Sequence, residues 1–257
     1  QHLDAVRRGA KASADAVETN EDARVEKVHL TTRDDVVVTG KTVADEARKG
    51  YDLLVMGLAR PLTPKGGFTK RFNDIAAGFD GPLCIVLKGS RSRISELGPG
   101  SVILVAVNGT ETARRGAELA LAIARTNRSL VRVLYVSRHG DKLRAETISH
   151  RREEAVLKDI ARLAERYGVE IATSVRAKGH PADAIVRQAD RNVSLLVMGV
   201  SRRSGDELLF GETATGVMQK CTRPMVLLSD ERIRRTDTEQ EARRSNSADD
   251  EKAKQAQ

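Results

Sequence analysis

The sequence predicts an α/β protein that contains two open, parallel β-sheets with flanking helices. Two observations support this fold class. Over residues 101–230, short apolar stretches rich in Val, Ile and Leu alternate with longer stretches whose apolar residues recur every three or four positions. In addition, the pentapeptide Leu-Leu-Val-Met-Gly occurs twice, at residues 53–57 and 195–199, at the end of an apolar stretch. The chain is therefore expected to contain the same unit twice.

The complete unit is expected at residues 101–230. A helix between two consecutive strands is the crossover that parallel pairing requires, so we expect a five-stranded parallel sheet with helices on both faces. The predicted strands span 102–107, 130–136, 169–175, 194–198 and 225–228. The predicted helices span 110–126, 143–167, 181–190 and 205–220.

The first unit, residues 1–89, matches only the second half of this pattern. It lacks an opening strand, helix and strand, which would precede Gln1, so we expect a fragment or a processed product and an exposed sheet edge that something must cover. The predicted elements are helices at 1–20, 41–49 and 68–79, and strands at 25–30 (extending toward 38), 51–56 and 82–87.

Two further segments complete the expected domain organisation. Residues 90–100, rich in Ser, Gly and Arg, form the predicted linker between the units. Residues 231–257 form a charged, polar tail for which disorder is expected.

Composition limits the classes of function. The 257 residues carry a formal charge of +8, but the positive charges are scattered among 36 acidic residues. This distribution argues against nucleic acid as a partner and favours anionic lipid headgroups as the alternative. No apolar run is long enough to span a membrane, and no signal peptide is visible. Cys84 and Cys221 lack metal-ligand spacing, so they are expected to be buried thiols in a reducing compartment.

The stretch from Leu195 to Thr213 passes from an apolar run through a glycine and a polar loop into a predicted helix. At such a junction the free N–H groups of the helix N-terminus can hold an anion. This stretch resembles the nucleotide loop of universal stress protein domains. Residues 102–111 resemble the opening strand and loop of the same family, and residues 179–185 resemble its third-strand loop.

The resemblance covers residues 100–230 well and residues 1–88 as a truncated copy. It implies a Rossmann-like fold of the universal stress protein type. It also implies an adenine nucleotide (ATP or AMP) or a cyclic dinucleotide as the ligand. The ligand-binding residues that it implies are Val107, Asn108, Gly109, Thr110, Val136, Met198, Gly199, Ser201, Arg202, Arg203, Gly211 and Thr213.

The family's phosphate motif, Gly-x2-Gly-x9-Gly-Ser/Thr, is altered in this sequence. Gly199 matches its first glycine, but Arg202 replaces the second, and the final pair is Gly211-Glu212 with the hydroxyl displaced to Thr213. A carboxylate at position 212 would repel a triphosphate, for which Arg202 and Arg203 could compensate as phosphate clamps. Asn108 stands where the family has an acidic residue on the adenine side.

A narrower resemblance involves residues 109–118, 201–203 and 210–213, which are similar to the tandem stress-protein region at the cytoplasmic end of bacterial cation/proton antiporters. It implies a non-catalytic, ligand-sensing regulatory region, tethered to the inner membrane through the antiporter portion of the same polypeptide. Two alternatives stay open. One is a free-standing universal stress protein that binds ATP, and the other is a structural dimerisation module whose last strands, 83–87 and 225–228, pair between domains or between protomers.

The remaining polar residues favour structural roles. His180 precedes Pro181 at a predicted helix start, where a capping or loop role is expected. Asp206 and Glu207 lie in the first turn of a predicted helix, where their negative charges would interact favourably with the helix dipole. Arg114-Arg115 belongs to a solvated face or meets an anion that approaches residues 108–110. The sequence contains no Ser/His/Asp arrangement, metal cluster or Walker loop, so no enzymatic activity is expected.

Overall fold

The computed structural model describes residues 37–59, 63, 67–90, 97–136, 143–176, 179–202 and 210–229, with backbone alone for 143–150. Every helix and strand named below belongs to one compact unit that begins at Thr39. The predictions for residues 1–36, for most of the linker and for the tail lie outside these ranges.

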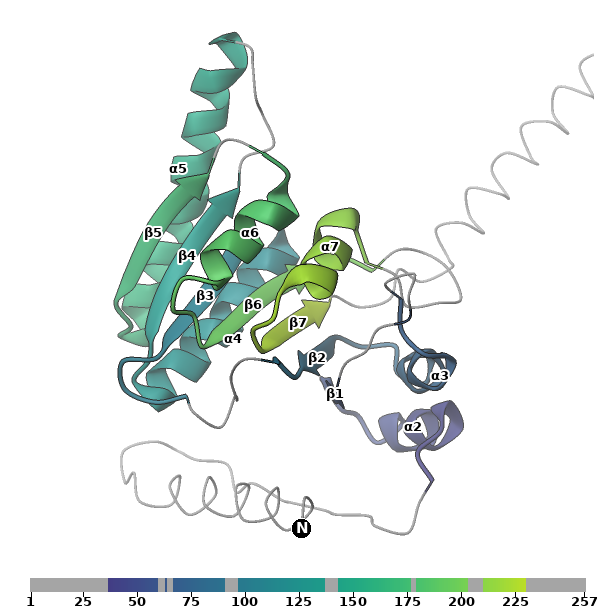
Figure 1. The fold of residues 1–257 in the computed structure, drawn as a ribbon. Helices are drawn as coiled ribbons and strands as arrows, with labels where there is room; N and C mark the ends of the chain where they lie inside the picture. The colour runs from purple at the N-terminus through teal and green to yellow at the C-terminus, as the bar shows by residue number, and fades with distance from the viewer. Residues whose placement is uncertain are drawn as a thin grey trace, which may run out of the picture. The chain divides into compact units, whose positions relative to one another are not determined.

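The described elements form an α/β fold around a single seven-stranded sheet (Figure 1). The strands are β1 (Leu54–Leu58), β2 (Leu83–Leu87), β3 (Val102–Val107), β4 (Leu130–Val136), β5 (Ile171–Arg176), β6 (Leu195–Val200) and β7 (Met225–Ser229). The helices are α2 (Gly40–Ala47), α3 (Lys70–Ala77), α4 (Glu111–Asn127), α5 (Leu143–Tyr167), α6 (Pro181–Ala189) and α7 (Glu212–Lys220). The predicted fold class is thus confirmed.

The sheet has the strand order β1-β2-β7-β6-β3-β4-β5. All neighbouring strands run parallel except β2 and β7, which are antiparallel. The two sheets expected from the sequence are therefore joined edge to edge into one. Ile85 faces Leu227 at the centre of this junction.

The last strands thus pair with each other within the chain. Both are already flanked on each side, β2 by β1 and β7, and β7 by β2 and β6. Self-association of two chains through these strands stays a prediction, and it would require one of these ladders to open.

The chain contains one set of four elements twice, with the same order and spacing. The first set is α2, β1, α3 and β2, and the second is α6, β6, α7 and β7. Each element of the first set precedes its counterpart by the same number of residues, to within one position. Both sets also have the same parallel strand pair. The repeated pentapeptide is thus one part of a longer structural correspondence between residues 40–87 and 181–229.

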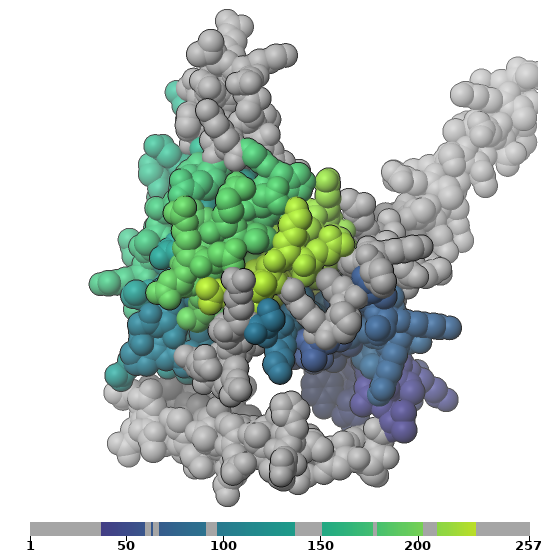
Figure 2. Space-filling model, in the orientation of Figure 1, coloured from purple at the N-terminus to yellow at the C-terminus, as the bar shows by residue number. Residues whose placement is uncertain are grey.

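Helices cover the two faces of the sheet unequally. The core on one face contains residues of α3, α6 and α7, with partly buried side chains of α2 packed against it; Figure 2 shows this face with α6 in green and α7 in yellow-green. The core on the other face is built from α4 and α5, over strands β3, β4, β6 and β7. No helix of the described ranges covers β1 on that second face, where Val55 is 58% exposed.

Most predicted boundaries agree with the structure to within two or three residues, and capping threonines mark three of the helix starts. Thr39, Thr69 and Thr110 each accept a hydrogen bond from a backbone N–H in the first turn of α2, α3 and α4. The helix expected at 205–220 is shorter than predicted. Phe210 pairs with Arg202 as an isolated antiparallel bridge, and α7 begins at Glu212.

Both cysteines are buried thiols, as expected. Cys84 lies on β2, and Cys221 follows the last residue of α7. Burial raises the pKa of the Cys84 thiol above its usual value, because the thiolate would lose its hydration. Both side chains therefore act as small apolar residues.

Candidate functional site

The candidate site lies at the carboxyl ends of the neighbouring parallel strands β3 and β6, where the chain turns into α4 and α7. Such an edge is the usual ligand position in open α/β sheets. Val107 ends β3 and Val136 ends β4, whereas Met198 lies two residues before the end of β6; all three side chains are buried. These three predicted residues therefore contribute buried apolar side chains at this edge and none of its polar groups.

The loop from Asn108 to Thr110 is held by its own side chains. Asn108 Oδ1 accepts hydrogen bonds from the Thr110 backbone N–H (3.1 Å) and from its hydroxyl (2.7 Å). Thr110 Oγ1 in turn accepts from Ala113 N (3.2 Å) and caps α4. Gly109 has a φ of +80°, and a Cβ there would lie 2.9 Å from Val156 Cγ2 of α5. The loop is therefore preformed, and the amide oxygen of Asn108 serves the loop itself.

Gly199 has a packing role that the phosphate motif does not suggest. A Cβ on Gly199 would collide with the backbone of Thr112 and Ala113 in the first turn of α4. Reciprocally, a Cβ on Gly116 would lie 2.7 Å from Gly199 N. Gly199 thus allows α4 to pack directly on the backbone of β6, and this packing explains the glycine without a phosphate.

Arg202 makes its contacts at the junction of β2 and β7. Its Nε donates to Ser229 Oγ (3.1 Å), and its Nη2 donates to the carbonyl of Gly81 (3.1 Å). Ser229 Oγ also donates to the carbonyl of Leu83 (3.4 Å). The guanidinium therefore holds the β2–β7 junction together in this structure, and the phosphate-clamp role of Arg202 stays a prediction. Arg203, its predicted companion, lies outside the described residues.

The start of α7 is the part of the predicted site that stays open. Gly211 is the N-cap residue, no side chain caps the helix, and a Cβ at Gly211 would meet nothing within 4 Å. At the corresponding position of the first set, Thr69 caps α3 through Phe72 N (3.4 Å). The N–H groups of the first turn of α7 are thus available to an anion.

Side chains around this helix start set its charge. Ser201 is exposed and Thr213 is half-buried. The exposed carboxylate of Glu212 lies 3.3 Å from His180 Nε2, so a contact joins the starts of α6 and α7. His180 is the N-cap residue of α6 without a side-chain cap bond, and the structure places it in a loop role as expected.

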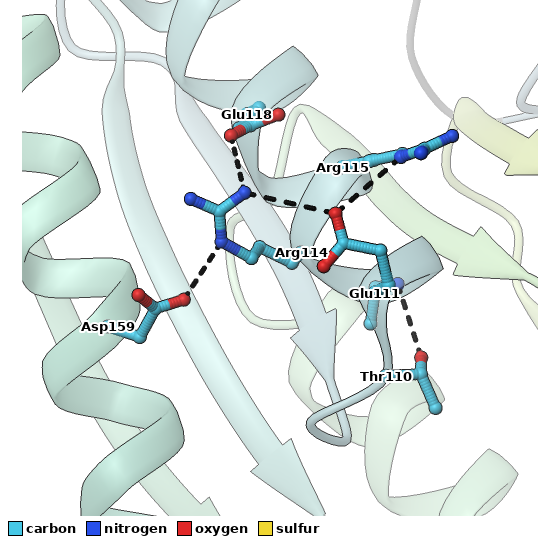
Figure 3. A network of polar contacts seen from close by, with 7 residues as sticks. Thr110, Glu111, Arg114, Arg115, Glu118 and Asp159 are labelled. Atoms are coloured by element: carbon cyan, nitrogen blue, oxygen red, sulfur yellow. Dashed lines mark hydrogen bonds and ion pairs between the residues drawn. The ribbon is translucent and has the colours of Figure 1, made fainter.

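Beside the Asn108 loop lies a cavity of about 250 Å³ between α4 and α5. Arg114 borders it and is surrounded by carboxylates (Figure 3). Its Nε donates to Asp159 (3.0 Å) and its Nη1 donates to Glu118 (2.8 Å), while Glu111 contacts both Arg114 and Arg115. The hydrogen bond with Asp159 is the main cause that raises the pKa of Arg114.

This network answers the question that the sequence left open about Arg114. The guanidinium of Arg114 contacts three carboxylates in this structure. It is therefore not available there to an anion at residues 108–110. The i,i+4 spacing of Arg114 and Glu118 is visible in the sequence, whereas the partner Asp159 comes from a different helix and has no local signal.

Comparison with known proteins identifies the family. The family model described as the universal stress protein family matches residues 101–229, just over half of the chain. The chain belongs to the universal stress protein family. The match covers strands β3 to β7 of this universal stress protein, together with the candidate site between β3 and β6.

Solved universal stress proteins resemble the chain at low sequence identity. One from Archaeoglobus fulgidus has a TM-score of 0.52 at 16% identity, and covers 86% of this chain and 78% of its own. One from Pseudomonas aeruginosa has a TM-score of 0.51 at 18% identity, with the same coverage. A universal stress protein from Archaeoglobus fulgidus in complex with dAMP has 20% identity, a TM-score of 0.41, and covers 50% of this chain and 97% of its own. No protein with a curated functional description matches the sequence.

Two features are absent from the part of this universal stress protein that the structure describes. Its helices include none with the length and apolar character needed to cross a membrane. Its side chains include no group of three or more His, Cys, Asp or Glu placed to hold a metal ion.

Proposed function

We propose that this chain binds an adenine nucleotide at the carboxyl edge of β3 and β6, with the phosphate at the start of α7. The observation that carries the proposal is the uncapped helix start at Gly211, which has open space beside it. Because β3 and β6 are parallel neighbours, the preformed loop at Asn108–Thr110 lies at the same edge of the sheet. It supplies polar groups opposite the helix N-terminus.

The charges at this edge favour one phosphate over three. Glu212 is exposed in the first turn of α7, and Arg202 is engaged at the β2–β7 junction. A triphosphate would bring more negative charge toward Glu212 without an arginine clamp from position 202. The proposed ligand is therefore a nucleoside monophosphate or a cyclic nucleotide. ATP, the ligand of the alternative hypothesis, is expected to bind more weakly.

The Gly211→Ser substitution tests this site. A serine at the N-cap accepts a hydrogen bond from the first turn of α7 and so competes with the phosphate, while the helix itself gains a few tenths of a kcal/mol. Calorimetry with dAMP and cAMP should show about tenfold weaker binding, together with an unchanged or slightly higher unfolding temperature. Gly98→Ser, in open space before β3, is the matched control. Equal affinity of the G211S variant and the parent would refute the proposed position of the phosphate.

We further propose that the chain is a tandem, non-catalytic regulatory region of a cation/proton antiporter on the cytoplasmic side of the inner membrane. The similarity of residues 109–118, 201–203 and 210–213 to such regions supports this, and the correspondence between residues 40–87 and 181–229 supports the tandem arrangement. The coding sequence upstream of Gln1 tests it. Multiple apolar helices there would agree with the proposal, and an immediate start codon would favour the free-standing universal stress protein.

A further inference from the structure

A second cavity, of about 470 Å³, lies on the face of the sheet that α6 covers. It is formed where α6 ends and leaves β4 and the edge strand β5 uncovered. Arg132 of β4 faces Ala172 of β5 in the ladder, so residues 132, 174 and 176 share this face. The lining residues are Arg132, Ser174, Arg176, Gln188, Arg191 and Asn192.

The lining contains three arginines and no carboxylate. Within the described ranges, none of the three makes an ion pair, whereas Arg114 on the other face contacts three acidic residues. Asp190 adjoins Arg191 in the sequence but does not line the cavity. The positive charge of this cavity is therefore not balanced by its own walls.

Two of these guanidinium groups are held in place by neutral acceptors. Arg132 Nη1 donates to the backbone carbonyl of Arg191 (3.3 Å). With the amide of Gln188 oriented so that its oxygen faces Arg176, that oxygen accepts from Arg176 Nε (2.9 Å) and Nη2 (2.8 Å). Gln188 is buried, so its side chain is a fixed support. Neutral partners orient the arginines without cancelling their charge.

We infer that this arginine cavity binds the phosphate group of a ligand. Guanidinium groups donate planar pairs of N–H bonds that match phosphate oxygens, and orientation before binding lowers the entropic cost. The phosphate can belong to a soluble phosphorylated molecule or to a phospholipid headgroup, since both present the same oxygens. The cavity lies at the end of α6, whereas the Gly211 helix start lies beside the start of α6, where Glu212 contacts His180. The inference therefore does not depend on the proposed nucleotide site.

Inorganic pyrophosphate and vesicles serve as the probes. Calorimetry should show saturable pyrophosphate binding that weakens with added salt, or sedimentation should show binding to phosphatidylglycerol vesicles but not to phosphatidylcholine vesicles. The first result identifies a soluble ligand and the second a headgroup. The absence of both, at pyrophosphate concentrations up to about 10 mM, would overturn the inference.

Variants locate the binding in the cavity. Arg132→Gln and Arg176→Gln should each weaken binding by about tenfold. Arg125→Gln, an exposed arginine of α4 on the other face, removes the same charge and should change the affinity less than about twofold. Equal effects at positions 125 and 132 would show unspecific attraction to a basic protein and overturn the site.

The Gln188→Glu substitution gives an independent readout, because it removes no arginine. A glutamate of the same shape would form an ion pair with Arg176 and cancel its charge. Pyrophosphate binding should weaken at least as much as in R176Q, while thermal unfolding shows that the fold is retained. Unchanged binding in folded Q188E would contradict the role assigned to Arg176. Binding should also be unchanged in G211S, which separates this site from the nucleotide site.

Discussion

The same five residues, Leu-Leu-Val-Met-Gly, occupy two different environments in this protein. In the second copy Leu195 and Val197 are 1% and 0% exposed, and Gly199 lies against the backbone of α4. In the first copy Leu53 and Val55 are 41% and 58% exposed, and a Cβ on Gly57 would meet nothing within 4 Å. The difference shows that a motif defines a strand and its direction, whereas the neighbouring elements decide whether its residues are core.

The largest expected effect is a loss of stability when the glycine of the second copy is replaced. Gly199→Ala forces a methyl group into the backbone of α4, so the free energy of unfolding should fall by about 3 kcal/mol. Gly57→Ala, the matched control, should change it by less than about 0.5 kcal/mol. Urea unfolding of both variants measures the difference. Equal losses would mean that the two glycines have the same surroundings.

A smaller effect is expected at the junction between the two copies. Arg202→Met keeps the apolar stem but removes the hydrogen bonds to Gly81 and Ser229, which should cost about 1–2 kcal/mol. Hydrogen exchange should speed up first at the amides of β2, because that strand depends on the junction. Arg125→Met, on an exposed helix surface, serves as the control. Unchanged exchange in β2 would assign Arg202 a different role.

The smallest expected effect concerns the contact between helices α6 and α7, compared with that between α2 and α3. Lys220 Nζ donates to Asp183 (2.7 Å) and joins α6 to α7, whereas α2 and α3 approach through Gly40 and Gly78. The hydrogen bond with Lys220 lowers the pKa of Asp183. A lowered folded-state pKa stabilises the fold above the usual aspartate pKa of about 3.9, and this contribution is lost as the pH falls through the folded value.

The variant Asp183→Asn should therefore be slightly less stable than the parent at neutral pH, and the two should converge below the pKa of Asp183. Thermal unfolding between pH 7 and the acid range measures this, with the exposed Asp190→Asn as the control. A difference that grows toward acid pH would contradict the sign derived from the Lys220 contact.

Much of the fold could be predicted because its signals are local. Short stretches rich in Val and Leu marked β3, β4 and β6, and Thr110 marked the start of α4. The roles of Gly199 and Arg202 could not be predicted, because their partners are distant in sequence. Gly199 contacts the first turn of α4, and Arg202 bonds Gly81, 121 residues away. A phosphate motif and a close helix–strand contact both select glycine, so the sequence alone does not distinguish them.

In the candidate sites, too, local features could be predicted and contacts between distant segments could not. The caps and turns at Asn108, Thr110 and His180 follow from adjacent residues, and the open start of α7 at Gly211 follows from a glycine at the N-cap. The arginine cavity gave no signal, because its residues come from β4, β5, α6 and the turn after α6. These segments are brought together by the order of strands in the sheet.

The antiparallel β2–β7 pair gives the two copies an approximate two-fold axis. Ile85 faces its own counterpart, Leu227, and the pairs on either side, Cys84 with Leu228 and Val86 with Val226, are exchanged by the axis. Such an interface would be isologous between identical subunits. Here one covalent chain supplies both halves, so dilution does not separate them, and the stability of the joined sheet is expected to be independent of protein concentration.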